Sequence, residues 1–289
     1  MNIKDIDTQL LNEYLEKKSP LDPIRAEESM VIKPEVKQQG YIVKGLDDKV
    51  GCNIYIDDLA DMDEEGLADF LYEKFQEHRH DLEGLNPEVW LTKEYILDHV
   101  YPRLTNLRNI QNLIDTDTCF LHYLDLCIIY YIRCDVKDGY GSITLKKPHL
   151  DQANLTLADI KEQALVNQEK ISEARSMFEV IKDFAPDTMD IDDPAQGRMY
   201  VFSNRNNDSY GASCILTEKF HNSVNALFGE KAYIIPSSIH EIIVVDQTGN
   251  AADLGNMIRE VNETAVNPTE VLSDHPYLYD NGVITCIDC

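Results

Sequence analysis

Several neighbouring strand-forming runs of the C-terminal half are separated by turns that are too short to hold a crossover helix. The end of the chain reads PYLYDNGVITCI, in which Asn281-Gly282 is the residue pair that a type I′ turn requires. Such a turn joins antiparallel neighbours, because parallel strands need a connection of about a dozen residues or more. Hairpins of this kind alternate with amphipathic helices, and strand-helix-strand units are few. The pattern predicts an α+β fold with a mainly antiparallel sheet and packed helices.

The first part of the chain has a more helical pattern. Apolar residues at helical spacing predict a helix that ends before Pro20 and further helices downstream. Two short β-rich runs, Tyr41 to Val43 and Cys52 to Ile56, predict one hairpin. The further helices are expected from Glu64 to Phe75, from Val89 to Val100 and from Leu104 to Ile114. We therefore expect a smaller, mostly helical region over residues 1–118 and a C-terminal α+β domain over residues 119–289.

From Phe120 onward the chain favours strands. The run FLHYLDLCIIYYIRC and the later SITLKK, separated by the turn KDGYG, predict a second hairpin. Thr156 and Asp159 resemble a capping box at the start of the next helix, and another helix is expected from about Ser172 to Phe184. A later helix has one apolar face, formed by Leu254, Met257, Ile258 and Val261 at i, i+3, i+4 and i+7.

The charge of the chain is strongly acidic. A formal net charge of −26 results from 26 basic and 52 acidic residues. Such a chain repels phosphate backbones, so direct nucleic-acid binding is not expected, whereas a partner with a basic surface is favoured. The simplest explanation of the charge is solubility, perhaps with adaptation to a salty or crowded cytosol. Imitation of nucleic acid in a basic groove of another protein is a special case of partner binding.

No cofactor, metal or membrane signal stands out in the sequence. The apolar runs are much shorter than the roughly 18 residues of a membrane span, and the N-terminus lacks the apolar core of a signal peptide, so we expect a cytoplasmic protein. The seven cysteines are an odd number, and we expect reduced thiols. Cys286 and Cys289 form a C-x-x-C pair without the two further ligands of a zinc site. Phosphate-binding glycine loops are absent from the sequence as well.

The segment YIIPSSIHEIIVVD contains the residue types of a serine-hydrolase triad. If the chain runs as a regular strand from Ile239 to Asp246, His240 and Glu241 point to opposite faces, so Glu241 does not orient the imidazole. Ser238 and His240 could still meet, with a distant carboxylate such as Asp274 completing the site. The alternative is an ordinary hairpin, in which His240 is half-buried and is held by backbone carbonyls or by a carboxylate of the EVLSDH segment.

Two further polar groups are candidate sites. Asp274 and His275 lie in an expected turn before a proline and could contact the His240 hairpin. Asn204 and Arg205 open a polar turn that could bind an anionic ligand. In both places local backbone capping explains the same residues, because turns favour Asn, Asp and Ser for their own hydrogen bonds.

Several linear motifs of the C-terminal half carry a family resemblance. They are MYVFSN with GASCIL, then YIIPSSIHEIIVV, then MIREVNETAVNPTEVLSDHPYLYD, in that order. Together with NIYIDDL, HYLDLCIIYYI and ITLKKPHL nearer the N-terminus, they make the chain similar to domain-of-unknown-function family 5688, which is mostly clostridial. The resemblance covers most of the chain and implies no reaction, because the family has no established activity.

Our leading hypothesis is a non-catalytic interaction or regulatory protein that binds a protein partner. The first alternative is a hydrolase that uses Ser238 and His240 with Asp274 and His275. The second alternative is a sensor of a small ligand. The sequence leaves open whether the protein is an enzyme.

Overall fold

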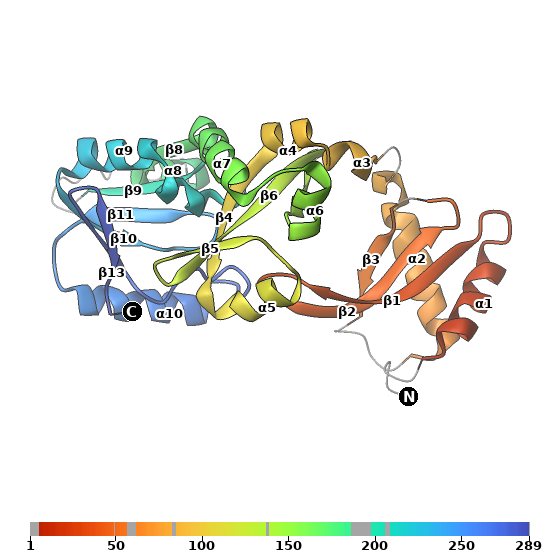
Figure 1. The fold of residues 1–289 in the computed structure, drawn as a ribbon. Helices are drawn as coiled ribbons and strands as arrows, with labels where there is room; N and C mark the ends of the chain where they lie inside the picture. Colours follow the sequence, from red (N-terminus) through yellow and green to blue (C-terminus); the bar gives the residue numbers. More distant parts are fainter. Residues whose placement is uncertain are drawn as a thin grey trace. The chain divides into compact units, whose positions relative to one another are not determined.

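The structure is a computed structural model that describes residues 6–48, 50–56, 62–82, 85–136, 139–185, 198–205 and 209–288. The chain divides into two compact units (Figure 1). The first unit contains Met1–Leu91 and Cys134–Gly141, and the second contains Thr92–Arg133 and Ser142–Cys289. Both combine helices with antiparallel sheets, which confirms the predicted α+β fold.

The first unit is an antiparallel sheet with helices packed on it. The strands follow the order β1-β2-β3. The elements of this unit are α1 (Thr8–Lys18), β1 (Ile24–Ile32), β2 (Lys37–Gly45), β3 (Cys52–Tyr55), α2 (Glu64–Leu82) and α3 (Pro87–Trp90). The predicted hairpin is confirmed as β2 and β3, with Val43 opposite Cys52. Strand β1 was not predicted, because most of its side chains are exposed or half-buried and its apolar alternation is weak.

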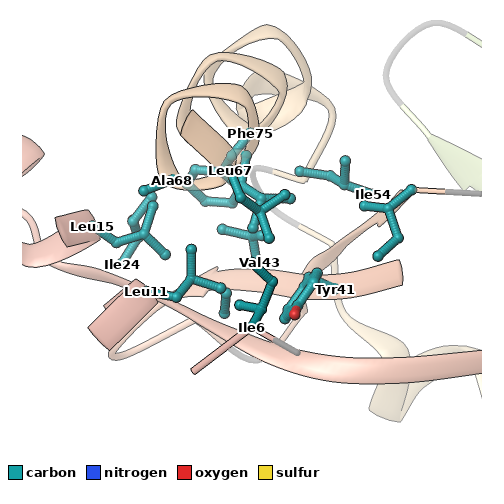
Figure 2. Packing of buried hydrophobic residues seen from close by; sticks show 13 residues of the cluster. Ile6, Leu11, Leu15, Ile24, Tyr41, Val43, Ile54, Leu67, Ala68 and Phe75 are labelled. Atoms are coloured by element: carbon teal, nitrogen blue, oxygen red, sulfur yellow. The ribbon is translucent and has the colours of Figure 1, made fainter. Parts of the chain in front are cut away.

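The core of the first unit forms where α1 and α2 meet the sheet (Figure 2). Asp7 caps α1, since its side chain accepts from Gln9 N and Leu10 N, and the helix then buries Leu11 and Leu15 one turn apart. The other core side chains come from β1, β2, β3 and α2, and they include Ile24, Tyr41, Val43, Ile54, Leu67, Ala68, Leu71 and Phe75. Full burial of one such aliphatic or aromatic side chain contributes about 1.5–3 kcal/mol.

The larger sheet of the second unit has the order β13-β12-β10-β11-β9-β8, and all its neighbouring strands are antiparallel. Its strands are β8 (Ser172–Ser176), β9 (Met199–Asn204), β10 (Lys231–Ile235), β11 (Ile242–Asp246), β12 (Tyr277–Asp280) and β13 (Val283–Cys286). The type I′ hairpin is confirmed, because Asn281 and Gly282 have φ values of 50° and 83° between β12 and β13.

Four of the described helices lie between the strands of this sheet along the chain. They are α8 (Met177–Phe184), the 3-10 helix η5 (Gly211–Leu216), α9 (Glu218–Phe228) and α10 (Ala251–Thr264). Aromatic side chains join α9 to β9, since the ring centroids of Phe220 and Phe202 lie 4.9 Å apart and those of Phe228 and Tyr200 lie 5.8 Å apart. Edge-to-face pairs of this kind add about 0.5–1.5 kcal/mol to the burial of the rings.

A smaller sheet has the order β4-β6-β5, and β7 pairs with β6. It belongs to the second unit except for the end of β6 and the start of β7, which fall within Cys134–Gly141 of the first unit. Its strands are β4 (Val100–Asn106), β5 (Phe120–Tyr123), β6 (Leu126–Val136) and β7 (Gly139–Thr144). The helices around it are α4 (Lys93–His99), η2 (Leu107–Asn109), α5 (Ile110–Asp115), α6 (Lys147–Ala153) and α7 (Leu157–Ile171). Helix α7 begins with the predicted capping box of Thr156 and Asp159 and packs against β4 and α4.

Two of the helix predictions are wrong at positions where strands pair over longer distances. The helix expected from Leu104 to Ile114 begins as a strand, because β4 pairs with β6 along its whole length. The helix expected from about Ser172 begins as β8, which pairs with β9, and α8 starts only at Met177. The predicted second hairpin is confirmed as β6 and β7. The run from Phe120 contains two strands, however, because it folds back on itself as β5 and β6, with Leu124 at a φ of 55° in the turn.

The first of the three boundaries between the compact units along the chain falls between Leu91 and Thr92, so residues 92–118 belong to the second unit. The expected division into residues 1–118 and 119–289 stays a prediction. No helix within the described residues is long and apolar enough to cross a bilayer.

Candidate functional site

His240 lies in a bend between β10 and β11. The strand expected from Ile239 begins only at Ile242, so the alternation of side chains does not apply to residues 239–241. Ser238 N donates to Glu241 O at 3.2 Å, and His240 N donates to Ser238 Oγ at 3.1 Å. Both bonds satisfy backbone groups that the irregular path takes out of the sheet.

Both nitrogens of the His240 ring face other parts of the second unit. Nδ1 accepts from Tyr210 N at 3.1 Å, and Nε2 lies 3.7 Å from Glu270 Oε1. Because Nδ1 is an acceptor, the neutral ring carries its proton on Nε2, toward the carboxylate. Glu270 opens the EVLSDH segment, and Ile239 N also donates to its carbonyl oxygen at 2.9 Å. The expected carboxylate partner of His240 is therefore Glu270.

Aromatic and cationic groups stack beneath this histidine. The Tyr210 ring lies nearly parallel to the His240 ring, at 13° and 5.8 Å between centroids. Arg103 Cζ lies 4.2 Å from the centroid of the Tyr210 ring, and Tyr131 meets the same ring edge-on at 4.9 Å. A guanidinium this close to an aromatic face is attracted by the ring quadrupole. The stack ties the His240 bend to β4 and β6.

The chain approaches itself very closely at Gly211. Tyr210 takes the left-handed conformation, with φ 65°, and turns the backbone toward the His240 bend. A Cβ on Gly211 would lie 2.4 Å from His240 O and 2.5 Å from Asn204 N. Only glycine leaves room for this crossing without a shift of the backbone.

The geometry of Ser238 differs from that of a catalytic serine. Its Oγ accepts from a backbone amide, and no hydrogen bond in the described part of the chain joins Ser238 Oγ to the His240 ring. A nucleophile needs a base within hydrogen-bond reach, and a third group has to orient that base. Glu241 has another partner, since it accepts from Ser237 Oγ at 3.2 Å.

The turn of Asp274 and His275 is held by α10. Asn262 Nδ2 donates to Asp274 Oδ1 at 2.8 Å and to Ser273 O at 2.9 Å. His275 Nδ1 is buried and has no hydrogen-bond partner among the described residues. Within residues 209–288 no hydrogen bond or ion pair joins this turn to His240.

Asp125 forms a second polar centre that the sequence analysis missed. Its carboxylate accepts from Ser273 Oγ at 2.6 Å and from Tyr277 OH at 2.7 Å. Burial, together with the negative charge of Asp125, raises the pKa of Tyr277 well above its usual value. The only sequence signal was the presence of these polar groups inside apolar runs, at LDL and at SDHPYLY. The network fixes the 273–277 segment to the turn between β5 and β6.

The two candidate ligand-binding residues differ in exposure. Asn204 is fully buried, and its amide accepts from Gln168 Nε2 at 2.6 Å and donates to Ser209 O at 2.9 Å. Arg205 is exposed next to it. Asn204 therefore positions the start of the polar turn, and ligand binding by Asn204 and Arg205 stays a prediction.

The described residues contain no cluster of three or more His, Cys, Asp and Glu side chains that could hold a metal ion. Cys286 is disulfide-bonded, so the expectation of reduced thiols is wrong for this residue. Five other cysteines are free: Cys52, Cys119, Cys127, Cys134 and Cys214. Burial raises the pKa of the Cys127 thiol to about 11, which leaves it protonated and unreactive near neutral pH.

Comparisons with known proteins identify the family of this chain but no reaction. Neither the curated proteins nor the solved structures contain a match to this chain. A family described as "Family of unknown function (DUF5688)" matches residues 8–281. The matched range includes the His240 bend, the Asp125 centre and α10, and it confirms the resemblance seen in the sequence. The chain belongs to the DUF5688 family.

Proposed function

We propose that the protein is a non-catalytic interaction protein of the cytoplasm that binds a protein partner through a basic surface of that partner. The observation that carries the proposal is the net charge of −26. A field of this size attracts basic proteins, speeds their association and repels nucleic acids. Direct binding of nucleic acid is therefore not part of the proposal.

The geometry around His240 supports a role without catalysis. A serine hydrolase needs an imidazole nitrogen that is open to the serine hydroxyl. In the bend, His240 Nδ1 accepts a backbone hydrogen bond and Nε2 faces Glu270, while Ser238 Oγ accepts from the His240 amide. These contacts stabilise a folded surface, which is what a binding protein requires.

The experiment is a reconstituted binding measurement. Partners are captured from the native host with the full chain as bait, purified, and titrated against the chain at several salt concentrations. We expect a basic partner whose dissociation constant rises steeply with salt, because screening weakens exposed charge pairs. A charge-reduced variant, with exposed acids changed to their amides, should bind more weakly. Absence of any partner, with a salt-insensitive monomer, contradicts the proposal.

The hydrolase alternative is tested in the same preparation. The chain and its Ser238→Ala and His240→Ala variants are assayed against a panel of ester, amide and phosphoester substrates. Equal background rates for the three proteins support a role without catalysis. Turnover by the natural chain that both variants lose would replace the interaction role by a hydrolase.

A further inference from the structure

Helix α10 carries more apolar surface than the core of the second unit covers. Its four periodic apolar residues predict a single buried face, but only Ile258 among them is buried, next to Gly255. Met257 and Val261 are each 45% exposed, and Leu254 is half-buried. The apolar face is therefore divided between the core and the surface.

The exposed part of this face is a continuous stripe. Leu254, Met257 and Val261 are separated by three and four residues, so their side chains follow one another along about 10 Å of the helix axis. We call these three residues the α10 stripe. Side chains in this arrangement match the i, i+3, i+7 anchors by which two helices pack.

The stripe belongs to a helix that is well fixed. Asn250 caps its first turn, since its side chain accepts from Ala252 N. Near the other end, Asn262 donates to Ser273 O and to Asp274 Oδ1. Gly255 lies against Pro276, where a Cβ would come within 3.6 Å of the proline ring. Exposure of the stripe is thus a property of a folded surface and not of a frayed end.

The charge beside the stripe has one sign. Asp253 precedes Met257 by one turn and Glu260 follows it by one turn, and both acids are exposed. Arg259 is the one basic residue in the sequence of α10. It is two residues from both Met257 and Val261 and therefore projects from the opposite side of the helix, and its guanidinium donates to Asn256 Oδ1 at 2.7 Å. The α10 stripe, with acids along its outer side, is therefore complementary to a partner helix that has an apolar row with basic residues along one side.

We propose that the α10 stripe, with Asp253 and Glu260, is the docking face for an amphipathic helix of the partner that carries Lys or Arg about two turns apart. The inference rests on the proposed function, because it names the surface and the kind of segment through which a basic partner binds. A second copy of this chain fits poorly, since each copy has a net charge of −26 and the two acidic flanks would repel each other.

The probe is a synthetic helical peptide with leucines at i, i+3 and i+7 and lysines beside them two turns apart. Binding to the full-length chain is followed by fluorescence anisotropy. Two comparison peptides have the lysines replaced by glutamates, or the same residues in scrambled order. We expect the ordered basic peptide to bind about tenfold or more tightly than either comparison peptide, because it alone matches both the stripe and its acids.

Variants of exposed residues locate the site. Met257→Asp with Val261→Asp should weaken the basic peptide about tenfold or more, because both apolar anchors become charged. Asp253→Lys with Glu260→Lys should weaken the basic peptide and strengthen the glutamate peptide. Ile181→Asp is the matched control, since Ile181 of α8 is 47% exposed, and it should leave binding unchanged. Circular dichroism verifies that each variant is folded.

The outcomes separate the docking face from the proposed function. If the natural basic partner binds and the stripe variants bind it as tightly as the unchanged chain does, the docking face is wrong and the proposed function stands. Equal binding of the ordered and scrambled basic peptides likewise overturns the docking face, because charge alone would then suffice. Loss of a dimer in the Met257→Asp variant would identify a second copy as the occupant. Absence of binding to every basic protein and peptide overturns both proposals.

Discussion

Replacing Gly211 by alanine tests whether close backbone packing at the His240 bend stabilises the second unit. A Cβ at this position would lie 2.4 Å from His240 O, 2.5 Å from Asn204 N and 2.9 Å from Ser203 Cα. An ordinary contact between such atoms begins at about 3.5 Å. All three neighbours are backbone atoms, so rotation of a side chain cannot relieve the overlap, and β9 or the bend has to move.

The size of the effect follows from the two interactions that this movement disturbs. Overpacking of a well-filled site costs about 1–3 kcal/mol. The shift also weakens the hydrogen bond from Ala212 N to Ile239 O, which is 3.4 Å long, and such a bond contributes about 1 kcal/mol. We expect Gly211→Ala to lower the free energy of unfolding by about 2–4 kcal/mol.

The matched control is Gly255→Ala in α10. A Cβ at Gly255 would lie 3.4 Å from Arg259 Nη1, the end of a flexible side chain, and 3.6 Å from Pro276 Cδ. Alanine is favoured over glycine inside a helix by about 1 kcal/mol. This substitution should therefore leave stability unchanged or raise it, which is the opposite sign.

The assay must report on the second unit. Trp90, the one tryptophan of the chain, lies in the first unit, so urea unfolding is followed by the near-ultraviolet circular dichroism of the tyrosines. Amide hydrogen exchange in β9 and β11 gives the local effect. If Gly211→Ala unfolds at the same urea concentration as the natural chain, the steric reasoning is refuted. If Gly255→Ala destabilises the chain as much as Gly211→Ala, the cause is an effect that both glycine substitutions share, and not steric overlap at Gly211.

Three further predictions concern buried polar groups. Tyr277→Phe should lower the free energy of unfolding by about 1.5–3 kcal/mol, measured by urea unfolding, because Asp125 loses a hydrogen bond to its charged oxygen; an unchanged midpoint would show that this bond adds nothing. Asn204→Ala should cost about 1–3 kcal/mol in the same assay and increase exchange in β9, because it removes both amide bonds from a fully buried site. Burial lowers the pKa of His149 and of His221 in the folded chain. Below about pH 6.5 the unfolded chain therefore takes up protons that the folded chain excludes. We expect the contribution of these two histidines to the free energy of unfolding to be fully present above that pH and to fall as the pH decreases below it. His221→Gln should lose part of this acid sensitivity, and an unaltered pH dependence would contradict the assignment.

The contacts of the candidate site could be predicted only in part from the sequence around His240. The sequence suggested backbone carbonyls or a carboxylate of the EVLSDH segment as partners of His240, and the Glu270 carboxylate lies 3.7 Å from Nε2. It did not indicate the contact of His240 Nδ1 with Tyr210 N, which requires η5 to lie against the bend. Asp125 and Tyr277 are 152 residues apart, so their pairing leaves no pattern within any short window of sequence.

Local chemistry alone determined those elements whose signals lie within a few residues of one another. The Asn281-Gly282 turn, the capping box at Thr156 and the hairpin of β2 and β3 each depend on conformational preferences or hydrogen bonds between near neighbours. The α+β fold class followed from the same kind of information, because the order and type of the elements can be inferred from local patterns. The family was indicated instead by the resemblance of linear motifs, which the family match confirms.

Tertiary structure decided the elements whose hydrogen bonds have distant partners. The helix expected from Leu104 begins as the end of β4, because β6 supplies a full set of backbone partners, and β8 forms against β9 for the same reason. Likewise, the sequence of α10 specifies a four-residue apolar face, but only packing decides that Ile258 is buried and Met257 is left at the surface. A strand's pairing and a side chain's burial both depend on residues far along the chain, and local patterns do not contain them.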